Sequence, residues 1–325
     1  MRALICREFG DVSDLEVGEL PDLQPGAGQV LIDVHACGVN FPDVLLVQGK
    51  YQFTPPLPFS PGAEVAGTVA VLGSDVTGLK VGDAVVAVVL WGGMAEQLVV
   101  DASAVTHITP GVDMVSASSL LMAHGTAHHA LFDRGRLAGD DTLLVLGAGG
   151  GVGLAAVELA ALRGARVLAA ASSDDKLQRC LDQGATDVID LRSQDLRDAV
   201  RKLTDGKGVD LCLDPVGGDV AEAAVRSMAW RGRYLVVGFA SGDIPRIPLN
   251  LPLLKGCEIV GVFWGSFRER EPGPGSDGIA QLMADLGSGR LQPVISEVFP
   301  LEKAAMALKV IEARRAVGRL VVEIV

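Results

Sequence analysis

The sequence predicts an α/β protein of two domains, one a β-rich barrel and the other a doubly wound parallel sheet. Its 325 residues are enough for about two domains of ordinary size. Residues 1–110 contain many short β-branched runs between glycine and proline turns, a pattern typical of a compact barrel. From residue 141 onward strands alternate with amphipathic helices, a pattern typical of a parallel sheet covered by helices.

In the first domain the clearest strand pattern lies at Gln29–Ala36. Val30, Ile32 and Val34 alternate there with other residues at the period of a half-buried strand. Further β-branched runs bounded by turns predict strands at residues 65–72, 84–90 and 92–100.

The second half of the chain predicts strands at residues 143–146, 166–171, 188–190, 209–213, 234–237 and 258–263. The helices expected between them lie at residues 152–163, 174–183, 194–203 and 219–228. Residues 268–277 are rich in proline and glycine and predict a surface loop. Helices at 279–286 and 301–313 and a strand at 320–325 follow, and we expect this tail to pack back on the first domain.

Composition excludes several classes of partner. The net charge of −12 argues against nucleic acid, because no basic face is available to neutralise phosphates. No apolar run reaches the roughly 18 residues that span a bilayer, and residues 1–8 turn polar too early for a signal peptide. The five cysteines form no C-x-x-C pair, so we expect reduced thiols and a cytoplasmic protein.

The most distinctive stretch is the glycine turn Gly147–Gly153, between a predicted strand and a predicted helix. This arrangement can bring a dinucleotide pyrophosphate to the N-terminus of the helix. Ala148 replaces the first glycine of the G-x-G-x-x-G spacing, whereas Gly150 and Gly153 supply the other two. Such a run alone is also compatible with a tight turn, so its context has to decide.

That context is an ordered set of motifs: Cys37–Asp43, Pro58–Gly67, Val81–Val85, Gly93–Val100, His124–Ala127, Ala148–Gly153 and Gly184–Asp187. Together they resemble the zinc-free quinone oxidoreductase branch of the medium-chain dehydrogenase/reductase superfamily, in which an alanine is usual at the first glycine position. The resemblance implies a GroES-like barrel-type catalytic domain at residues 1–122 and 265–325. It also implies a Rossmann dinucleotide-binding domain at residues 123–264.

The resemblance further implies cofactor contacts and an assembly state. The implied cofactor-binding residues are Thr126, Gly149, Gly150, Gly151, Val152, Gly153, Gly238, Phe239, Val262, Phe263 and Trp264. For the Phe and Trp side chains, ordinary core packing is a comparable explanation. Relatives pair the edge strand that matches Glu258–Phe263 across a two-fold axis, so a homodimer is expected.

A catalytic zinc ion is not expected. By motif alignment, the zinc ligands of alcohol-oxidising relatives correspond to Asn40, Ala63 and about Met122. An amide, a methyl group and a thioether cannot build a tetrahedral N/S site, and Glu64 alone cannot hold the ion. We therefore expect no zinc, which disfavours alcohol oxidation by a Lewis acid. The resemblance also implies that no flavin is used.

The residues after the second strand of the parallel sheet favour NADPH over NADH. NAD-selective domains place an acid there for the ribose 2′-hydroxyl, whereas this chain has Ser172 and Ser173. Lys176 and Arg192 are candidates to bind a 2′-phosphate. The alternative is that a serine only caps the next helix and that Lys176 is a solvated surface residue; two aspartates after Ser173 also weaken the case.

At the reacting centre the resemblance implies Asn40, Asp43 and Tyr51. The Asn40 amide and the Tyr51 hydroxyl are candidate donors to a quinone or enone oxygen, which gains negative charge as hydride arrives. Alternatively, Asp43 caps the helix that begins near Phe41, and Tyr51 contacts the cofactor instead of acting as an acid.

Three functions are compared. The leading one is an NADPH-dependent oxidoreductase that reduces a quinone or the activated C=C of an enone by hydride transfer without metal. An enoyl- or acryloyl-CoA-type reductase would need a basic rim for the CoA phosphates, and only the scattered Lys50, Lys80 and Arg134 are available. The third is an NADPH-binding protein with negligible turnover. Turnover with quinones and enones distinguishes them.

Overall fold

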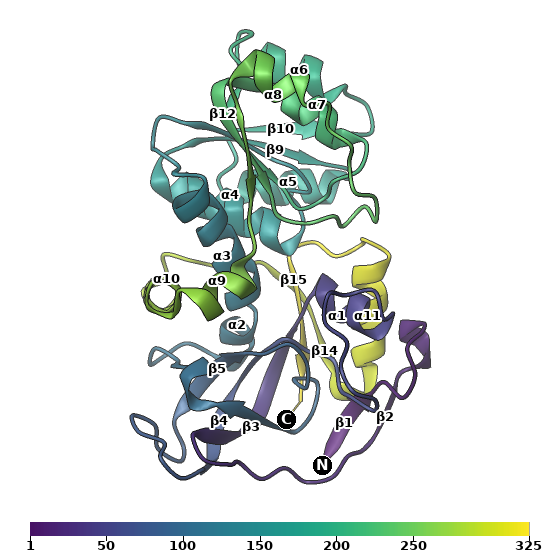
Figure 1. Ribbon diagram of the computed structural model, residues 1–325, viewed down its shortest axis with the longest axis vertical. Coiled ribbons are helices and arrows are strands. Elements are labelled where there is room, and N and C mark those ends of the chain that lie inside the picture. Colours follow the sequence, from purple (N-terminus) through teal and green to yellow (C-terminus); the bar gives the residue numbers. More distant parts are fainter. Residues whose placement is uncertain (325) are drawn as a thin grey trace. The chain divides into compact units, whose positions relative to one another are not determined.

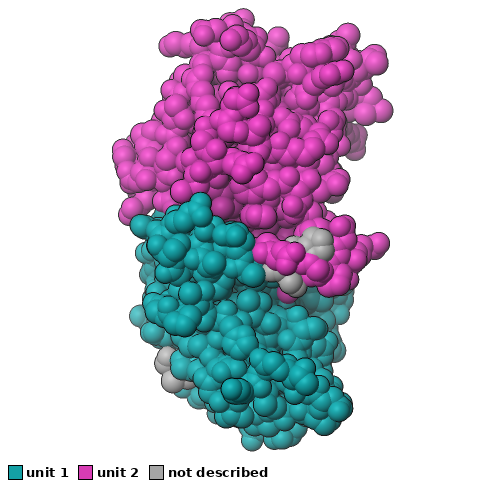
Figure 2. All heavy atoms as spheres, turned by 90° about the vertical axis from the view of Figure 1, so that its left-hand side faces the viewer, with its two compact units in different colours: residues 1–122, 279–325 teal, residues 123–278 magenta. Residues whose placement is uncertain are grey.

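The computed structural model describes residues 1–324, apart from the side chains of Pro274 and Ser276. Val325, the last residue of the predicted closing strand, lies outside the described residues. The chain divides into two compact units, coloured separately in Figure 2. Unit 1 comprises Met1–Met122 and Ile279–Val325, and unit 2 comprises Ala123–Gly278.

Unit 1 is β-rich (Figure 1). Its strands are β1 (Arg2–Ile5), β2 (Glu16–Glu19), β3 (Gln29–Val39), β4 (Glu64–Leu72), β5 (Ala84–Val88), β6 (Gln97–Asp101), β7 (Val105–His107), β14 (Ile295–Pro300) and β15 (Arg319–Glu323). Its helices and 3-10 turns are η1 (Val12–Asp14), α1 (Phe41–Val47), η2 (Ala102–Ala104), α2 (Met114–Ser118), η4 (Leu301–Lys303) and α11 (Ala304–Glu312).

The main sheet of unit 1 runs in the order β14-β15-β3-β4-β5-β7, and β6 also pairs with β3. Strand β3 lies inside the sheet, and residues on both of its faces are buried, among them Val30 and Ile32 on one face and Leu31 on the other. α1 and α11 pack against one another (Figure 1), and Leu308 of α11 joins the same core. β15 pairs antiparallel with the end of β3, which confirms that the C-terminal tail packs back on the first domain.

Unit 2 is a parallel sheet in the order β10-β9-β8-β11-β12-β13. Its strands are β8 (Thr142–Val145), β9 (Arg166–Ala171), β10 (Asp187–Asp190), β11 (Val209–Asp214), β12 (Met228–Val236) and β13 (Glu258–Gly261). Its helices are α3 (Leu121–His128, whose first two residues belong to unit 1), the π-helix η3 (His129–Arg134), α4 (Gly151–Arg163), α5 (Asp174–Asp182), α6 (Leu196–Leu203), α7 (Val220–Arg226), α8 (Asn250–Lys255) and α9 (Trp264–Arg270).

The strand order of unit 2 explains where a ligand would bind. From β8 the chain continues outward to β9 and β10, then returns to the other side of β8 with β11, β12 and β13. The loops that follow β8 and β11 therefore meet at a topological switch point, where open α/β sheets bind their ligands. The predicted α/β fold with a Rossmann-type doubly wound sheet is confirmed.

The surface loop predicted at residues 268–277 is wrong, because this stretch is mostly helical. α9 covers Trp264–Arg270, and α10 spans Pro272–Gly287 and continues from unit 2 into unit 1. Proline is tolerated in the first turn of a helix, where its missing N–H would have no intrahelical partner. Strand β6 also starts later than expected, at Gln97.

The packing of α9 places residues 265–278 in unit 2, whereas the sequence-based division assigned them to the catalytic domain. The Phe267 ring stacks on His129 with ring centroids 4.0 Å apart. A Cβ added at Gly125 would lie 2.4 Å from the Trp264 ring, so only glycine leaves room for that ring on α3. Among residues 1–324, no helix combines the length and the apolar character needed to cross a bilayer.

Candidate functional site

The glycine turn begins where β8 ends, at the switch point of the sheet. Gly147 has φ of 58°, in the left-handed region that favours glycine. The Ala148 N–H donates to the Ala170 carbonyl on β9 at 3.0 Å and ties the turn to the neighbouring strand. A Cβ added at Gly153 would lie 2.4 Å from the Gly147 carbonyl oxygen. The turn thus achieves the close approach of helix and strand that this motif requires, with Ala148 in place of the first glycine.

The N-terminus of α4 is suited to an anion. Gly150 is its N-cap residue and provides no side-chain cap. The N–H groups of Gly151, Val152 and Gly153 open the helix, where backbone donors and the helix dipole favour negative charge. A pyrophosphate fits these donors, and Gly149 adds no side chain beside them.

Lys176 lies against the glycine turn. A Cβ added at Gly149 would be 2.5 Å from the Cβ of Lys176, so the lysine stem packs directly on this glycine. The side chain is half-buried, and desolvation lowers the pKa of its ammonium group. Lys176 is therefore only partly solvated. Ser173 caps α5 by accepting the Lys176 backbone N–H at 3.4 Å, and Ser172 is exposed at the end of β9.

Arg192 reaches the start of α5 but is engaged by two carboxylates. Its guanidinium donates to Asp190 at 2.8 Å and to Asp174. The hydrogen bonds that Arg192 donates to Asp190 and Asp174 raise the pKa of Arg192, and the same guanidinium lowers the pKa of Asp190. A 2′-phosphate would have to compete with these carboxylates for Arg192, whereas Lys176 lies beside the turn itself.

The predicted contacts after β12 lie beside a second loop. The Gly238 N–H donates to the Asp214 carbonyl at 3.3 Å. A Cβ added at Gly217 would be 2.8 Å from the Phe239 ring, so this ring rests on the loop that follows β11. Phe239 is 37% exposed, and one side of its ring remains accessible.

The other predicted contacts of unit 2 differ in exposure. Val262 is buried and extends the sheet, since its N–H donates to the Val236 carbonyl at 2.9 Å. Phe263 is 48% exposed, whereas the Trp264 ring is buried against Gly125. Core packing therefore accounts for Trp264. Thr126 is half-buried on α3.

Unit 1 contains a buried polar centre, which we define as Asn40, Glu64, Arg319, the Ser119 carbonyl and the Met122 N–H. Arg319, on β15, is 5% exposed. Its guanidinium donates to a Glu64 carboxylate oxygen, to Asn40 Oδ1 at 2.8 Å and to the Ser119 carbonyl at 2.9 Å. Burial lowers the pKa of Arg319 to about 10, so it stays charged at neutral pH.

Asn40 is fully engaged in this centre. Its Nδ2 donates to Glu64 at 3.0 Å and to the Gly38 carbonyl at 3.2 Å, while its Oδ1 accepts from Arg319. An amide nitrogen has two hydrogens, so Asn40 has no N–H left for a substrate oxygen. The second Glu64 oxygen accepts the Met122 N–H at 2.9 Å.

Sequence reasoning missed Arg319. The available signal was a single basic residue at the start of an otherwise apolar closing strand, Arg319–Glu323, whose first four residues are buried. A buried Glu64 also required a cationic partner from elsewhere in the chain.

Asp43 is fully buried at the start of α1. Its carboxyl group accepts the Asn40 N–H at 2.7 Å and the Gly62 N–H at 3.2 Å. It therefore sits at the third helical position and reaches back to the N-cap residue, which is Asn40. Burial raises the pKa of Asp43 to about 7.

Tyr51 is half-buried, with its ring 6.1 Å from that of Phe53. Burial, together with the nearby Asp43, raises the pKa of its hydroxyl, so the hydroxyl remains a donor at neutral pH. Among the described residues it has no hydrogen-bond partner, unlike the amide of Asn40.

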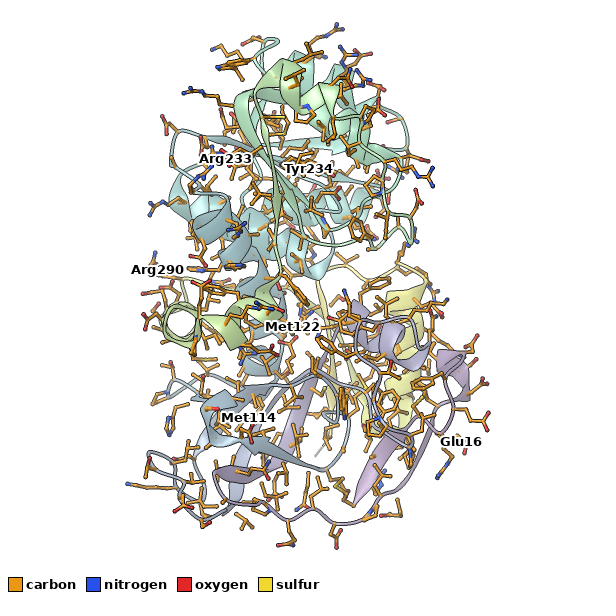
Figure 3. All side chains as sticks on the ribbon, viewed as in Figure 1. Glu16, Met114, Met122, Arg233, Tyr234 and Arg290 are labelled. Atoms are coloured by element: carbon orange, nitrogen blue, oxygen red, sulfur yellow. The ribbon has the colours of Figure 1, made fainter. Side chains whose placement is uncertain are left out.

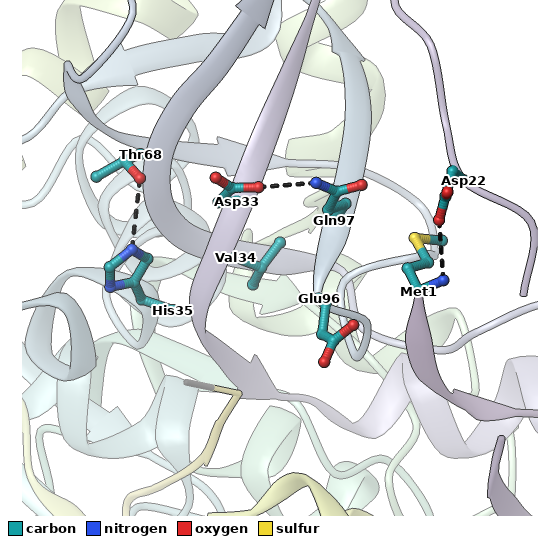
Figure 4. Close-up of a pocket in the computed structure, with 8 residues that line it drawn as sticks. All are labelled: Met1, Asp22, Asp33, Val34, His35, Thr68, Glu96 and Gln97. Atoms are coloured by element: carbon teal, nitrogen blue, oxygen red, sulfur yellow. Dashed lines mark hydrogen bonds and ion pairs between the residues drawn. The ribbon is translucent and has the colours of Figure 1, made fainter. Parts of the chain in front are cut away.

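Unit 1 also contains a separate pocket (Figure 4), lined by Met1, Asp22, Asp33, Val34, His35, Thr68, Glu96 and Gln97. Several of its polar groups are paired with one another. The Met1 ammonium lies 3.1 Å from Asp22, and Gln97 donates to Asp33 at 2.9 Å. It contains none of the predicted site residues and is not part of the candidate site.

Comparison with known proteins identifies the chain's relatives. Residues 26–110 match the family described as "Alcohol dehydrogenase GroES-like domain", and residues 151–275 match "Zinc-binding dehydrogenase". A quinone oxidoreductase-like protein 2 homolog from Nematostella vectensis is 39% identical over 324 residues, covering 99% of this chain and 88% of that protein.

Two solved structures have the same fold over the full chain. A mycobacterial protein complexed with NADPH superimposes with a TM-score of 0.93 at 32% identity, with 100% of both chains covered. Escherichia coli quinone oxidoreductase complexed with NADPH gives a TM-score of 0.92 at 25% identity, again with 100% of both chains covered.

The residues of unit 1 do not fit the zinc ion that one of the matched family descriptions names. Both oxygens of Glu64 are occupied by Arg319, Asn40 and the Met122 N–H. Asn40 is occupied as well, and Ala63 has no donor atom. In the described part of the chain, no group of three or more His, Cys, Asp or Glu side chains is arranged to hold a metal.

We predict that Arg319→Met destabilises unit 1 by about 3–5 kcal/mol, because it leaves Glu64 buried and unpaired. Adding Glu64→Gln should recover part of this loss, with a coupling energy of about 1–3 kcal/mol. Urea unfolding of the two single variants and the double variant measures it. Arg2→Met breaks the exposed pair with Glu302 in the same unit and should change stability far less. If the changes in unfolding free energy caused by Arg319→Met and Glu64→Gln simply add in the double variant, the two side chains do not form a stabilising pair.

We also predict a pH dependence from Asp43. In the unfolded chain it releases its proton near pH 3.8, and in the folded protein near 7. Between these values only the folded state holds the proton, so this group's contribution to stability falls as pH rises and is level above about pH 7.

Asp43→Asn cannot ionise, so its unfolding free energy, measured from pH 4 to pH 8, should lack this fall. The control variant is Asp75→Asn, which removes an exposed carboxylate of unit 1. It measures how the loss of a surface carboxylate alone changes the unfolding free energy. Native and Asp43→Asn curves that stay parallel between pH 4 and pH 7 would refute the assignment.

Proposed function

The chain belongs to the quinone oxidoreductase branch of the medium-chain dehydrogenase/reductase superfamily, and on that premise we propose that it is an NADPH-dependent oxidoreductase. It reduces a quinone or the activated C=C of an enone by hydride transfer, without a metal ion or flavin. The observation that carries the proposal is Lys176 packed on Gly149 at an intact dinucleotide turn. NADPH, when bound, supplies the hydride.

The binding of NADPH rests on the residues at the switch point. The uncapped start of α4 offers N–H donors to a pyrophosphate. Lys176 places a cation beside the turn, and exposed Ser172 occupies the position where an acid would repel a 2′-phosphate. Two structures of similar proteins carry NADPH, which supports the same cofactor here.

Tyr51 is a better candidate than Asn40 to donate a hydrogen bond to the substrate oxygen. The oxygen of a quinone or enone gains negative charge during reduction, and a preorganised donor lowers the barrier. Asn40 has committed both N–H groups to Glu64 and Gly38. The Tyr51 hydroxyl is protonated and has no partner among the described residues, so it is the available donor.

The polar centre supports independence from zinc. Arg319 provides the positive charge that balances Glu64, and the Asn40 side chain is engaged by Arg319, Glu64 and Gly38. A direct test is metal analysis of the purified protein combined with turnover in the presence of a chelator. Zinc at one equivalent per chain, or loss of turnover on chelation, would overturn this part of the proposal.

The function is tested by NADPH consumption with a panel of quinones and enones. Turnover with either class supports the proposal. Turnover only with an acyl-CoA enoyl substrate favours the acyl-CoA reductase, and NADPH binding without turnover favours a cofactor-binding protein. Both of these results contradict the proposed function.

We propose that two chains form a homodimer through strand β13. This strand is at the edge of the parallel sheet in the described chain, and Ile259 on it is 42% exposed. Trp230, Leu253 and Leu254, on β12 and α8 of the same unit, are exposed apolar side chains. Sedimentation equilibrium at micromolar concentration tests the dimer, and a monomer mass would exclude it.

A cytoplasmic location is proposed from the cysteines. All five are free and buried in the structure, which suits a reducing compartment. Subcellular fractionation of the native protein tests it, and recovery from an oxidising compartment would contradict it.

We predict that Lys176→Ala lowers kcat/KM for NADPH about tenfold to a hundredfold and changes the value for NADH little. Hydrogen bonds to charged groups contribute about 1.5–3 kcal/mol. Arg192→Ala is the comparison and should have a smaller effect, because Arg192 is already paired with Asp174 and Asp190. Steady-state kinetics with both cofactors measures the ratio.

Ser172→Asp should reverse the cofactor preference, since the new carboxylate would repel a 2′-phosphate and accept a 2′-hydroxyl. Equal kcat/KM for NADPH and NADH in the native enzyme, or an unchanged preference in Ser172→Asp, would refute the assignment.

We predict that Tyr51→Phe lowers kcat with quinone or enone on the order of a hundredfold, the usual effect of removing one donor to a developing oxyanion. The KM for NADPH and the thermal midpoint should change little. If instead the KM for NADPH rises and kcat is unchanged, Tyr51 is a cofactor contact and not the donor.

A further inference from the structure

A buried carboxyl group, Asp214, sits at the switch point without a role in the contacts predicted above. It ends β11, whose preceding residue Leu213 pairs with Val145 of β8, and it is 2% exposed. One carboxyl oxygen accepts the Val216 N–H at 2.7 Å and the Gly217 N–H at 2.8 Å. The other accepts the hydroxyl of Tyr234, a buried residue of β12 labelled in Figure 3.

These hydrogen bonds shape the loop Pro215–Gly218. Gly217 and Gly218 both have φ of 65°, so the chain turns sharply there. A Cβ added at Gly147 would lie 2.6 Å from the Val216 side chain, so the loop packs directly on the glycine turn. The position of Val216 therefore sets one wall of that turn.

The backbone of Asp214 organises the next loop. Its carbonyl accepts the N–H groups of Val237 at 2.9 Å and Gly238 at 3.3 Å. The Pro215 carbonyl then accepts the Ala240 N–H at 3.0 Å. One residue thus holds both loops that follow β11 and β12, including Gly238, a predicted cofactor contact.

We infer that Asp214 and Tyr234 are positioning residues for the dinucleotide, holding the Pro215–Gly218 loop and Gly238 in the arrangement that binds it. The inference rests on the proposed function. Tyr234 is suited to this task because it is buried and its hydroxyl donates to the carboxyl group. A phenylalanine would leave one Asp214 oxygen without its donor, so the carboxyl group that holds the loop would lose one of its three hydrogen bonds.

The test compares Tyr234→Phe with a matched variant, Thr204→Val. The Thr204 hydroxyl is also buried in unit 2, donating to the Val200 carbonyl at 2.8 Å and accepting the Gly208 N–H at 3.0 Å. It precedes the amino end of β11, away from the carboxyl end where Asp214 lies. Each variant therefore removes one buried hydroxyl from the same unit.

Tyr234→Phe should raise the dissociation constant for NADPH, measured by fluorescence titration, about fivefold or more. It should raise the KM for NADPH in parallel and change kcat less than about twofold. Hydrogen exchange of the Val216 and Gly217 amides should become faster. Thr204→Val should lower the thermal midpoint by about as much as Tyr234→Phe does. It should leave the dissociation constant for NADPH within about twofold of the native value.

Native affinity in Tyr234→Phe, or equal weakening in Thr204→Val, would overturn the inference. If Tyr234→Phe does not fold, Asp214→Asn provides a second test: its side-chain oxygen still accepts the two loop N–H groups, but its amide nitrogen can only donate to the Tyr234 oxygen, so the direction of that hydrogen bond is reversed and the acid is lost. Failure of the native protein to bind NADPH would instead refute the proposed function, a separate result.

Discussion

Arg319 on β15 and Glu64 at the start of β4 form a buried ion pair, and the centre of unit 1 is arranged around it. Removing either partner would leave a charge in a site from which water is excluded. The pair also joins the end of the chain to its first sheet, across the whole of unit 2 in sequence. It therefore ties the last strand to a domain whose strands β1 to β7 are encoded more than two hundred residues earlier.

The same pair decides which residues remain free for chemistry. Asn40 lies between Glu64 and Arg319, and its amide is oriented by both. A residue held this firmly contributes rigidity and has no donor left for a ligand. Asp43 next to it accepts two backbone N–H groups and is fully buried, so it shapes the start of α1. In unit 1 the accessible polar function among the predicted residues is therefore the Tyr51 hydroxyl.

The fold was largely predictable, because it follows from local patterns. Period-two alternation at Gln29–Ala36 and the buried apolar strands of unit 2 each indicate their element without reference to the rest of the chain. Residues 268–277 were misjudged because proline and glycine favour loops in general, whereas the ring stacking of Phe267 on His129 stabilises α9 from outside the segment. Arg319 and Asp214 were missed for a related reason. The partners of Arg319 are distant in sequence, whereas those of Asp214 are Val216, Gly217 and Tyr234. In both cases burial, which the local pattern does not show, makes the partners necessary.

Both units place a buried carboxyl group where a strand meets a loop, but the two groups are compensated differently. Glu64 is balanced by a full positive charge, which makes the polar centre self-contained. Asp214 is held only by neutral donors: two loop N–H groups and the Tyr234 hydroxyl. Hydrogen bonds to a carboxylate are directional, so the loop can satisfy Asp214 only in one arrangement. A cation there would attract an anionic cofactor away from the glycine turn, whereas neutral donors fix the loop without competing with α4 and Lys176, which the proposed function assigns to cofactor binding.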